Sequence, residues 1–150
     1  MQWFLDLITN PFLLTSISSW FIAQLLKVII NAIVHKKLIW ERLVGDGGMP
    51  SGHSATVSSL AAFTALACGP ASFQFAVTAI FAIVVCHDAM GVRQETGKQS
   101  MLLNEILDIL DSDELPEIKL KELVGHTPLQ VTAGILIGIA NACLMYFWVF

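Results

Sequence analysis

Charged side chains are scarce in this sequence of 150 residues, where Lys, Arg, Asp and Glu together make up 13%. Soluble domains carry roughly 25% of these residues and roughly 45–50% apolar ones. Here hydrophobic residues reach 55% without counting glycine. The composition excludes an ordinary soluble domain and indicates an integral membrane protein with one domain over residues 1–150.

Cysteine pairing is also absent from the sequence. The chain has three cysteines, Cys68, Cys86 and Cys143, and no Cys-x-x-Cys motif. Each lies in or beside an apolar segment, without the spacing of a disulfide framework or a zinc site. We interpret them as free thiols that pack as small hydrophobic side chains.

Basic residues are absent before Lys27, so the N-terminal region lacks the positively charged start of a signal peptide. Seven of the eight Lys and Arg fall in two stretches, 35–50 and 91–125. Positive charge marks the cytoplasmic side of a membrane protein. We therefore expect both stretches inside the cell, the turn at 69–72 and both termini outside, and the plasma membrane as the location.

Four apolar segments are present, at about 11–34, 51–68, 73–90 and 128–150. The first and last reach the roughly 20 residues that a helix needs to cross a membrane. The second is shorter and rich in Ser, Thr and Ala, so we expect it to pack against its neighbours and to form a helical hairpin with the third. The pattern predicts an all-α, multi-pass transmembrane bundle of about four spans.

The region 91–125 is too polar to span a membrane. Leu103, Ile106, Leu107 and Leu110 recur at helical spacing with acidic residues between them. This pattern predicts a short amphipathic helix at the membrane interface. We interpret the eight acids of the region as a solvated face, because nothing in their spacing favours a metal.

Polar residues within apolar segments are costly in a membrane, which makes each one a candidate for function. Gln24, Lys27 and Asn31 lie at positions i, i+3 and i+7, so they share one helix face. This stripe favours an inward-facing site, and the alternative is that Lys27 snorkels to the interface. Asp88, at the end of the third segment, fits a helix-end role as well as a catalytic one, with Arg93 just beyond it.

Two histidines stand at the starts of two predicted helices. Thr127 suits an N-cap, Pro128 the first helical position and Gln130 the partner position of a capping box, so a helix begins just after His126. His53 likewise follows a Pro-Ser-Gly loop at the start of the second segment. Helix N-termini offer unpaired N–H groups and a positive dipole end, which suit a phosphate. The alternative is a pair of interfacial histidines that only hydrogen-bond locally.

Four motifs carry a family resemblance: "AQLLK" at 23–27, "GGMPSGHSA" at 47–55, "DAMGVRQETGKQ" at 88–99 and "KELVGHTPL" at 121–129. Together they resemble the divergent branch of the type 2 phosphatidic-acid phosphatase and vanadium haloperoxidase superfamily, over about residues 10 to 140. The resemblance implies that His126 is the nucleophile and His53 the general acid. It also implies that Ser51 and the Gly52 N–H bind phosphate oxygens.

The sequence departs from the family pattern at three places. Gln130 stands four residues after His126, where the better-known members have an acid, and Leu120 stands where they have an arginine. The Arg-Pro pair expected seven residues after Lys27 is absent. The missing positive charges then fall to Lys27, Arg93 and Lys98 as phosphate ligands. Asp88 takes the role of orienting a histidine.

The resemblance implies a phosphatase that needs no metal or cofactor and acts on a membrane lipid phosphate or diphosphate. Phosphoryl transfer requires mainly positioning and stabilisation of the negative phosphoryl oxygens. Two alternatives stay open: a non-catalytic binder or transporter of phosphorylated lipids, and a membrane subunit whose polar residues only stabilise helix packing. No nucleic acid is expected as a partner.

Gly134 and Gly138 form a Gly-x-x-x-Gly pair in the last apolar segment. Such a pair lets two helix backbones approach closely. The partner helix is either another span of the same chain or a second copy, and a core of four spans makes a homodimer attractive.

The topology predicts the labelling of single cysteines placed at Asp46, Ala71 and Glu95 in a chain whose native cysteines are replaced by serine. In intact cells, a membrane-impermeant thiol reagent is expected to modify position 71 and to spare positions 46 and 95, because both basic loops emerge in the cytoplasm. Labelling at 46 and 95 but not at 71 would reverse the orientation.

Overall fold

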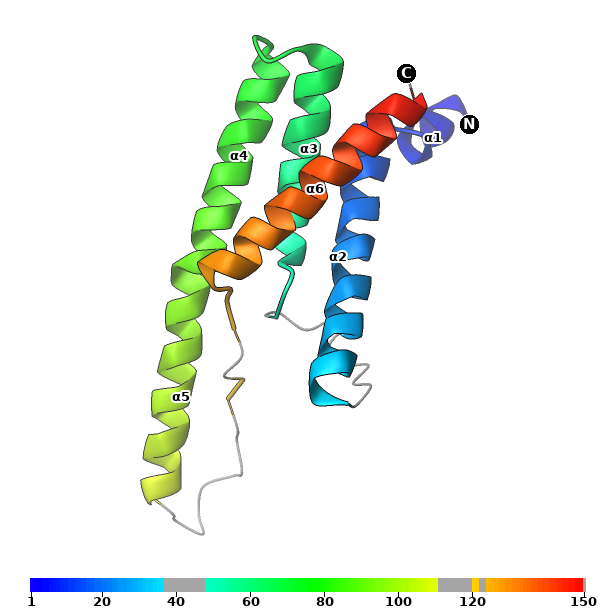
Figure 1. The fold of residues 1–150 in the computed structure, drawn as a ribbon. Coiled ribbons are helices and arrows are strands. Elements are labelled where there is room, and N and C mark those ends of the chain that lie inside the picture. The colour runs from blue at the N-terminus through cyan, green and yellow to red at the C-terminus, as the bar shows by residue number, and fades with distance from the viewer. Residues whose placement is uncertain (37–47, 111–119, 122–123, 150) are drawn as a thin grey trace.

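The computed structural model describes residues 1–36, 48–110, 120–121 and 124–149. Over these residues the regular structure is entirely helical, as Figure 1 shows, which confirms the all-α fold expected from the sequence. The helices are α1 (Gln2–Ile8), α2 (Pro11–His35), α3 (Gly52–Cys68), α4 (Phe73–Met90), α5 (Val92–Leu110) and α6 (Pro128–Val149).

Within the described residues, three stretches are long and apolar enough to cross a membrane: α2, α4 with most of α5, and α6. α3 has 17 residues, fewer than the roughly 20 that cross the hydrocarbon core. It lies in the centre of the bundle and contacts α2, α4 and α6. The multi-pass bundle and the packing of the second segment among its neighbours are both confirmed.

α3 buries an unusually polar surface. Its buried residues are mostly small or hydroxylated: Gly52, Ser54, Ala55, Val57, Ser58, Ser59, Phe63 and Thr64. Most of the hydroxyls donate to carbonyls of their own helix, as from Ser58 Oγ to Ser54 O at 2.6 Å and from Thr64 Oγ1 to Leu60 O at 2.7 Å. Ser54 Oγ donates to Oγ of the capping residue Ser51 at 3.0 Å. Because these groups are satisfied within the helix, burying them leaves little unpaired polarity.

Side-chain caps set where the helices begin. Asn10 Oδ1 accepts from the N–H groups of Phe12 and Leu13 at the start of α2, and Ser51 and Ser72 cap α3 and α4. The predicted hairpin of α3 and α4 is confirmed. Figure 1 shows its turn and both termini at one end of the bundle, and the starts of α3 and α6 toward the other end.

α6 runs obliquely across the bundle and contacts α2, α3 and α4. Asn141 is the polar link between α6 and α2. Its Nδ2 lies 2.9 Å from Ser18 Oγ, 2.8 Å from Ser19 Oγ and 3.2 Å from the Thr15 carbonyl oxygen. A buried amide held in this way fixes the position of one helix against the other.

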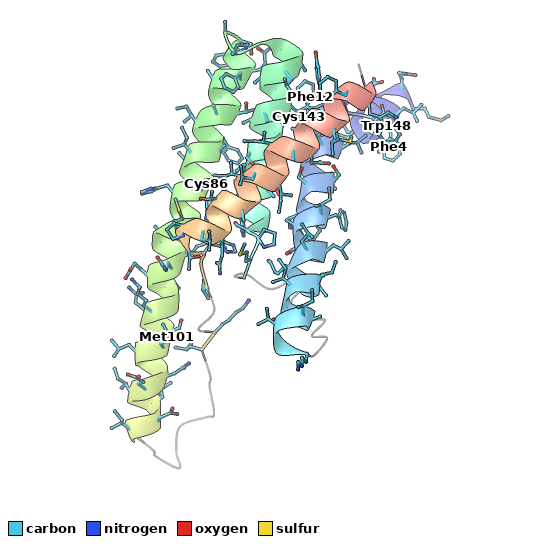
Figure 2. All side chains as sticks on the ribbon, viewed as in Figure 1. Phe4, Phe12, Cys86, Met101, Cys143 and Trp148 are labelled. Atoms are coloured by element: carbon cyan, nitrogen blue, oxygen red, sulfur yellow. The ribbon has the colours of Figure 1, made fainter. Side chains whose placement is uncertain are left out.

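The sequence predicted a short amphipathic helix at the membrane interface; the structure has a helix of 19 residues here, α5, and its position at the interface stays a prediction. α5 follows α4 after a break at Gly91 and extends away from the bundle in nearly the same direction, and Figure 2 marks Met101 on it. Leu103 and Ile106 are 48% and 43% exposed. The described part of the chain therefore leaves much of the apolar side of α5 uncovered.

The glycine pair of α6 packs against α3 of the same chain. A Cβ at Gly134 would overlap the Ser51 carbonyl oxygen. A Cβ at Gly138 would overlap the Ala55 carbonyl oxygen and Ser58 Oγ. The partner helix of the pair is thus α3, and the expected homodimer stays a prediction that requires another surface.

The close approach of α6 and α3 predicts that Gly138→Ala destabilises the fold by about 1–3 kcal/mol, because the added methyl group meets a backbone carbonyl that has no free space to move into. The change appears as a lower midpoint of thermal unfolding in detergent. The control is Ala140→Leu at an exposed position of the same helix, which is expected to leave the midpoint close to that of the parent. Equal midpoints for parent and Gly138→Ala would contradict the packing.

Candidate active site

The starts of α3 and α6 and the junction of α4 with α5 meet in one place. The Ser51 N–H donates to the Gln130 carbonyl oxygen at 3.0 Å, which ties the loop before α3 to the first turn of α6. The His126 N–H donates to the Ala89 carbonyl oxygen at 2.9 Å, which ties the residue before α6 to the end of α4. Both sequence motifs that contain a histidine therefore meet through backbone hydrogen bonds.

Gly125 makes the hydrogen bond between the His126 N–H and the Ala89 carbonyl oxygen possible. Its φ is +86°, in the left-handed region that glycine adopts most readily. A Cβ here would overlap the Gln94 backbone N–H and the Arg93 carbonyl carbon. Only glycine lets the chain pass this close to the first turn of α5, and the next residue, His126, is positioned by that passage.

The Gln130 side chain links His126 to the start of α6. Its Oε1 accepts from the Thr127 N–H at 3.1 Å, and Thr127 Oγ1 accepts from the Gln130 N–H at 3.4 Å. This reciprocal pair is the capping box that the sequence predicted. The same Oε1 lies 3.3 Å from Nδ1 of His126, so the capping residue also contacts the histidine.

These contacts favour one tautomer of a neutral His126. A backbone N–H only donates, so the Gln130 atom that faces Thr127 is the amide oxygen. Nδ1 of His126 approaches that same oxygen, so a proton on Nδ1 gives this contact its donor. In that tautomer Nε2 carries the lone pair of the ring, and the Gly48 backbone also hydrogen-bonds to His126.

The two histidines face each other across the site. The ring centroids of His53 and His126 are 6.1 Å apart, at an interplanar angle of 61°. His126 is buried, with 3% of the residue exposed, and His53 is half-buried. A hydrogen bond spans about 2.7–3.2 Å, so one tetrahedral anion that lies beside both rings is within reach of both.

Lys27 supplies a positive charge from α2. Only 5% of the residue is exposed, and its Cγ lies 3.5 Å from the place that a Cβ at Gly48 would occupy. Its charge contributes to lowering the pKa of His126. Lys27 therefore faces inward as the polar stripe on α2 indicated, and the alternative in which it snorkels to the interface is wrong.

His126 lies just before the spanning part of α6, and burial is the main influence that lowers its pKa below the ordinary value. The charges of Lys27 and His53 act in the same direction, whereas hydrogen bonds to the Gln130 side chain and the Gly48 backbone act against it. A histidine whose pKa falls below about 6.5 is largely neutral at pH 7.

Asp88, Arg93 and Lys98 are placed differently from the histidines. Arg93 Nε and Asp88 Oδ2 form an ion pair at 3.1 Å at the junction of α4 and α5, and both side chains are partly exposed. Lys98 Nζ lies 2.6 Å from Glu95 Oε1 on the exposed part of α5. The structure thus gathers Lys27, Ser51, Gly52, His53 and His126 in one site and leaves the role of orienting His126 to Gln130.

The sequence did not identify Trp20, whose side chain packs against the start of α3 at the site. A Cβ at Gly52 would lie 3.4 Å from Trp20 Cδ1 and 3.8 Å from Gln24 Cδ, so the first turn of α3 packs against both side chains. Trp20, Gln24 and Lys27 lie at i, i+4 and i+7, and this spacing could have identified it. Among the described residues no group of three His, Cys, Asp or Glu side chains is arranged to hold a metal ion.

The lowered pKa of His126 predicts a loss of stability in acid. The unfolded chain binds a proton near pH 6.5, whereas the folded chain resists it to lower pH, so the free energy of unfolding falls as the pH drops below about 6.5. His126→Gln removes this dependence, and chemical unfolding in detergent between pH 7.5 and 5 measures it. His87→Gln, at an exposed position, is the control. A His126→Gln chain that loses stability in acid as steeply as the parent would contradict the prediction.

The comparisons with known proteins agree with the motifs. The profile of the Divergent PAP2 family matches residues 8–141, a range that includes every residue of the site. A Bacillus subtilis (strain 168) protein described as "Uncharacterized membrane protein YuiD" is 40% identical over 157 aligned positions, which cover 96% of this chain and 99% of that protein. No solved structure matches the chain significantly. The resemblance read from the motifs is confirmed: the chain is an integral membrane protein and belongs to the divergent PAP2 family.

Proposed function

We propose that this protein is a membrane-embedded phosphatase that hydrolyses a lipid phosphate or diphosphate through His126 as nucleophile. The observation that carries the proposal is the 6.1 Å separation of the His53 and His126 rings at the N-terminal ends of two helices. The buried charge of Lys27 supports it, because the site is built to receive an anion at the membrane boundary.

The anion is bound first by the start of α3. The N–H groups of Gly52 and His53 belong to the first turn of that helix, where backbone donors lack partners within the helix and the dipole is positive. Lys27 adds a full positive charge from α2. Ser51, which is fully buried, brings its hydroxyl to the same turn. Donors from two helices then stabilise the charge that spreads over the phosphoryl oxygens.

The reaction follows from the two ring nitrogens. His126 Nε2 attacks phosphorus with its lone pair while the bond from phosphorus to the leaving oxygen breaks, and protonated His53 gives its proton to that oxygen. A water molecule then attacks the phosphohistidine with His53 as base, which releases inorganic phosphate and restores both histidines. Arg93, whose backbone lies against Gly125 beside His126, would join the binding of a larger diphosphate headgroup.

A second function is favoured by a specific observation, the amide at Gln130. An amide oxygen orients the imidazole, but it stabilises the imidazolium that develops during attack less than a carboxylate does. A binder or transporter of phosphorylated lipids would keep the anion site and lack turnover. In either function the protein lies in the plasma membrane with the histidines on the cytoplasmic face, where both basic loops are expected.

Gln130→Glu distinguishes the two functions. It preserves the capping box, since either side chain accepts from the Thr127 N–H, and it supplies the missing carboxylate. Loss of an orienting acid in the Ser-His-Asp triad costs about 10⁴-fold in rate, so we expect phosphate release from a panel of lipid phosphates to rise by at least tenfold. His126→Ala is expected to abolish release.

The control for Gln130→Glu is Gln99→Glu, the same chemical change at an exposed position of α5, and it is expected to leave the rate unchanged. Flat turnover in Gln130→Glu together with loss of turnover in Asp88→Asn would assign the orienting role to Asp88. If neither parent nor variant releases phosphate while each still binds vanadate, the binder is the correct function.

A further inference from the structure

A groove of about 380 Å³ lies between α3, α4 and α6, and α4 and α6 belong to stretches long and apolar enough to cross a membrane. Ala61 and Ala62 line it from α3, Ala79 and Ala82 from α4, and Ile135 and Ile139 from α6. Small side chains on two helices leave the space open, and its volume falls within the roughly 300–1,000 Å³ of small-molecule sites.

The lining of the groove specifies an apolar occupant. Ser58 is its one hydroxyl-bearing lining residue, and that hydroxyl already donates to Ser54 O at 2.6 Å. A polar ligand group placed here would lose its water without gaining a partner, which costs free energy. A hydrocarbon chain has no such cost.

The groove also has the length of a lipid chain in one leaflet. Its α4 wall runs from Phe75 to Cys86, which at 1.5 Å per residue is roughly 16 Å. Half of a hydrocarbon core of about 30 Å is about 15 Å. A single chain that enters at one end would therefore be accommodated along its length.

The groove ends close to the candidate active site, with one buried apolar cluster between the two. Cys86 lines the groove and also packs in a buried cluster with Val57, Ala89 and Val131. Ala89 is the residue whose carbonyl oxygen accepts from the His126 N–H. Figure 2 shows Cys86 on α4 close to α6. The end of the groove at Cys86 is thus its end nearest to the histidines.

We infer that this groove binds one hydrocarbon chain of the lipid whose phosphate lies beside His53 and His126. The inference rests on the proposed phosphate site and specifies its ligand. The lipid carries a chain that enters the bundle between helices, so the protein selects its ligand by the chain as well as by the headgroup.

The first test measures protection of Cys86 in the full-length protein with Cys68→Ser and Cys143→Ser, in detergent. Saturating dodecyl phosphate is expected to slow modification of the remaining thiol by N-ethylmaleimide about tenfold at ten times its Kd, because only the unliganded fraction reacts. Butyl phosphate and vanadate, which lack a long chain, are expected to leave the rate unchanged. Equal protection by dodecanol would overturn the inference, since the chain would then bind without the phosphate.

The second test fills the groove. Ala82→Trp is expected to reduce binding of dodecyl phosphate at least tenfold and to leave vanadate binding unchanged. Ile80→Trp is the matched control, because Ile80 is 62% exposed on α4 and does not line the groove. Partition of the alkyl phosphate into micelles is the same for both variants, so their ratio isolates the groove. If Ala82→Trp does not fold, the protection of Cys86 from N-ethylmaleimide tests the inference by itself.

The outcomes separate the groove from the phosphate site. A parent protein that binds no vanadate contradicts the proposed function. Normal vanadate binding with equal dodecyl phosphate affinity in Ala82→Trp and Ile80→Trp contradicts the groove alone. Protection of Cys86 that rises with protein concentration in the absence of lipid would show that a second copy occupies the groove, and would also overturn the inference.

Discussion

The site depends on how closely α6 approaches α3. Gly134 and Gly138 bring the backbone of α6 against carbonyl groups of α3, where a methyl group would overlap Ser51 O or Ala55 O. At the end of this contact the Ser51 N–H bonds to the Gln130 carbonyl oxygen. Because Ser51 caps α3 and Gln130 caps α6, the same approach that packs the two helices also sets their N-termini, and hence the two histidines, beside each other.

Membrane burial constrains how the polar residues of this bundle are used. Serine and threonine hydroxyls on α3 bond to their own helix, and Asn141 bonds to α2. These groups are satisfied and contribute to packing. The acceptor Gln24 Oε1 is buried with no hydrogen-bond partner among the described residues. It lies on the helix face of Lys27 and beside Gly52, so the unsatisfied polar atom lies next to the proposed anion site.

Local signals in the sequence were enough to predict the helices and to place the two histidines at the starts of helices. The His-Thr-Pro-Leu-Gln stretch contains its own N-cap, first-turn proline and capping partner, so the start of α6 follows from chemistry within five residues. The stripe of Gln24 and Lys27 needed only the helical period. Both predictions rest on interactions between residues close in the chain, which pattern alone determines.

The sequence pattern did not predict the contacts between segments that are far apart in the chain. The sequence left open whether Gly134 and Gly138 face α3 or a second copy, because either surface satisfies two glycines. It assigned Asp88 to a histidine, whereas the structure pairs this carboxylate with Arg93. It gave no sign that Gly125 lies against the backbone of Arg93 and Gln94. Each of these depends on how the bundle brings helix ends together.

In the proposed function, the amide at Gln130 sets the balance between binding the anion and hydrolysing it. Lys27, the two histidines and Gln130 contribute one fixed positive charge and no carboxylate. A carboxylate at Gln130 would stabilise a positively charged His126 during attack, but it would also oppose the negative charge of a phosphate in a partly buried site. The amide keeps the orientation of the ring and the affinity for the anion, and gives up part of the stabilisation of the transition state. The proposed function therefore predicts slow turnover and tight binding of a lipid phosphate as two consequences of the same residue.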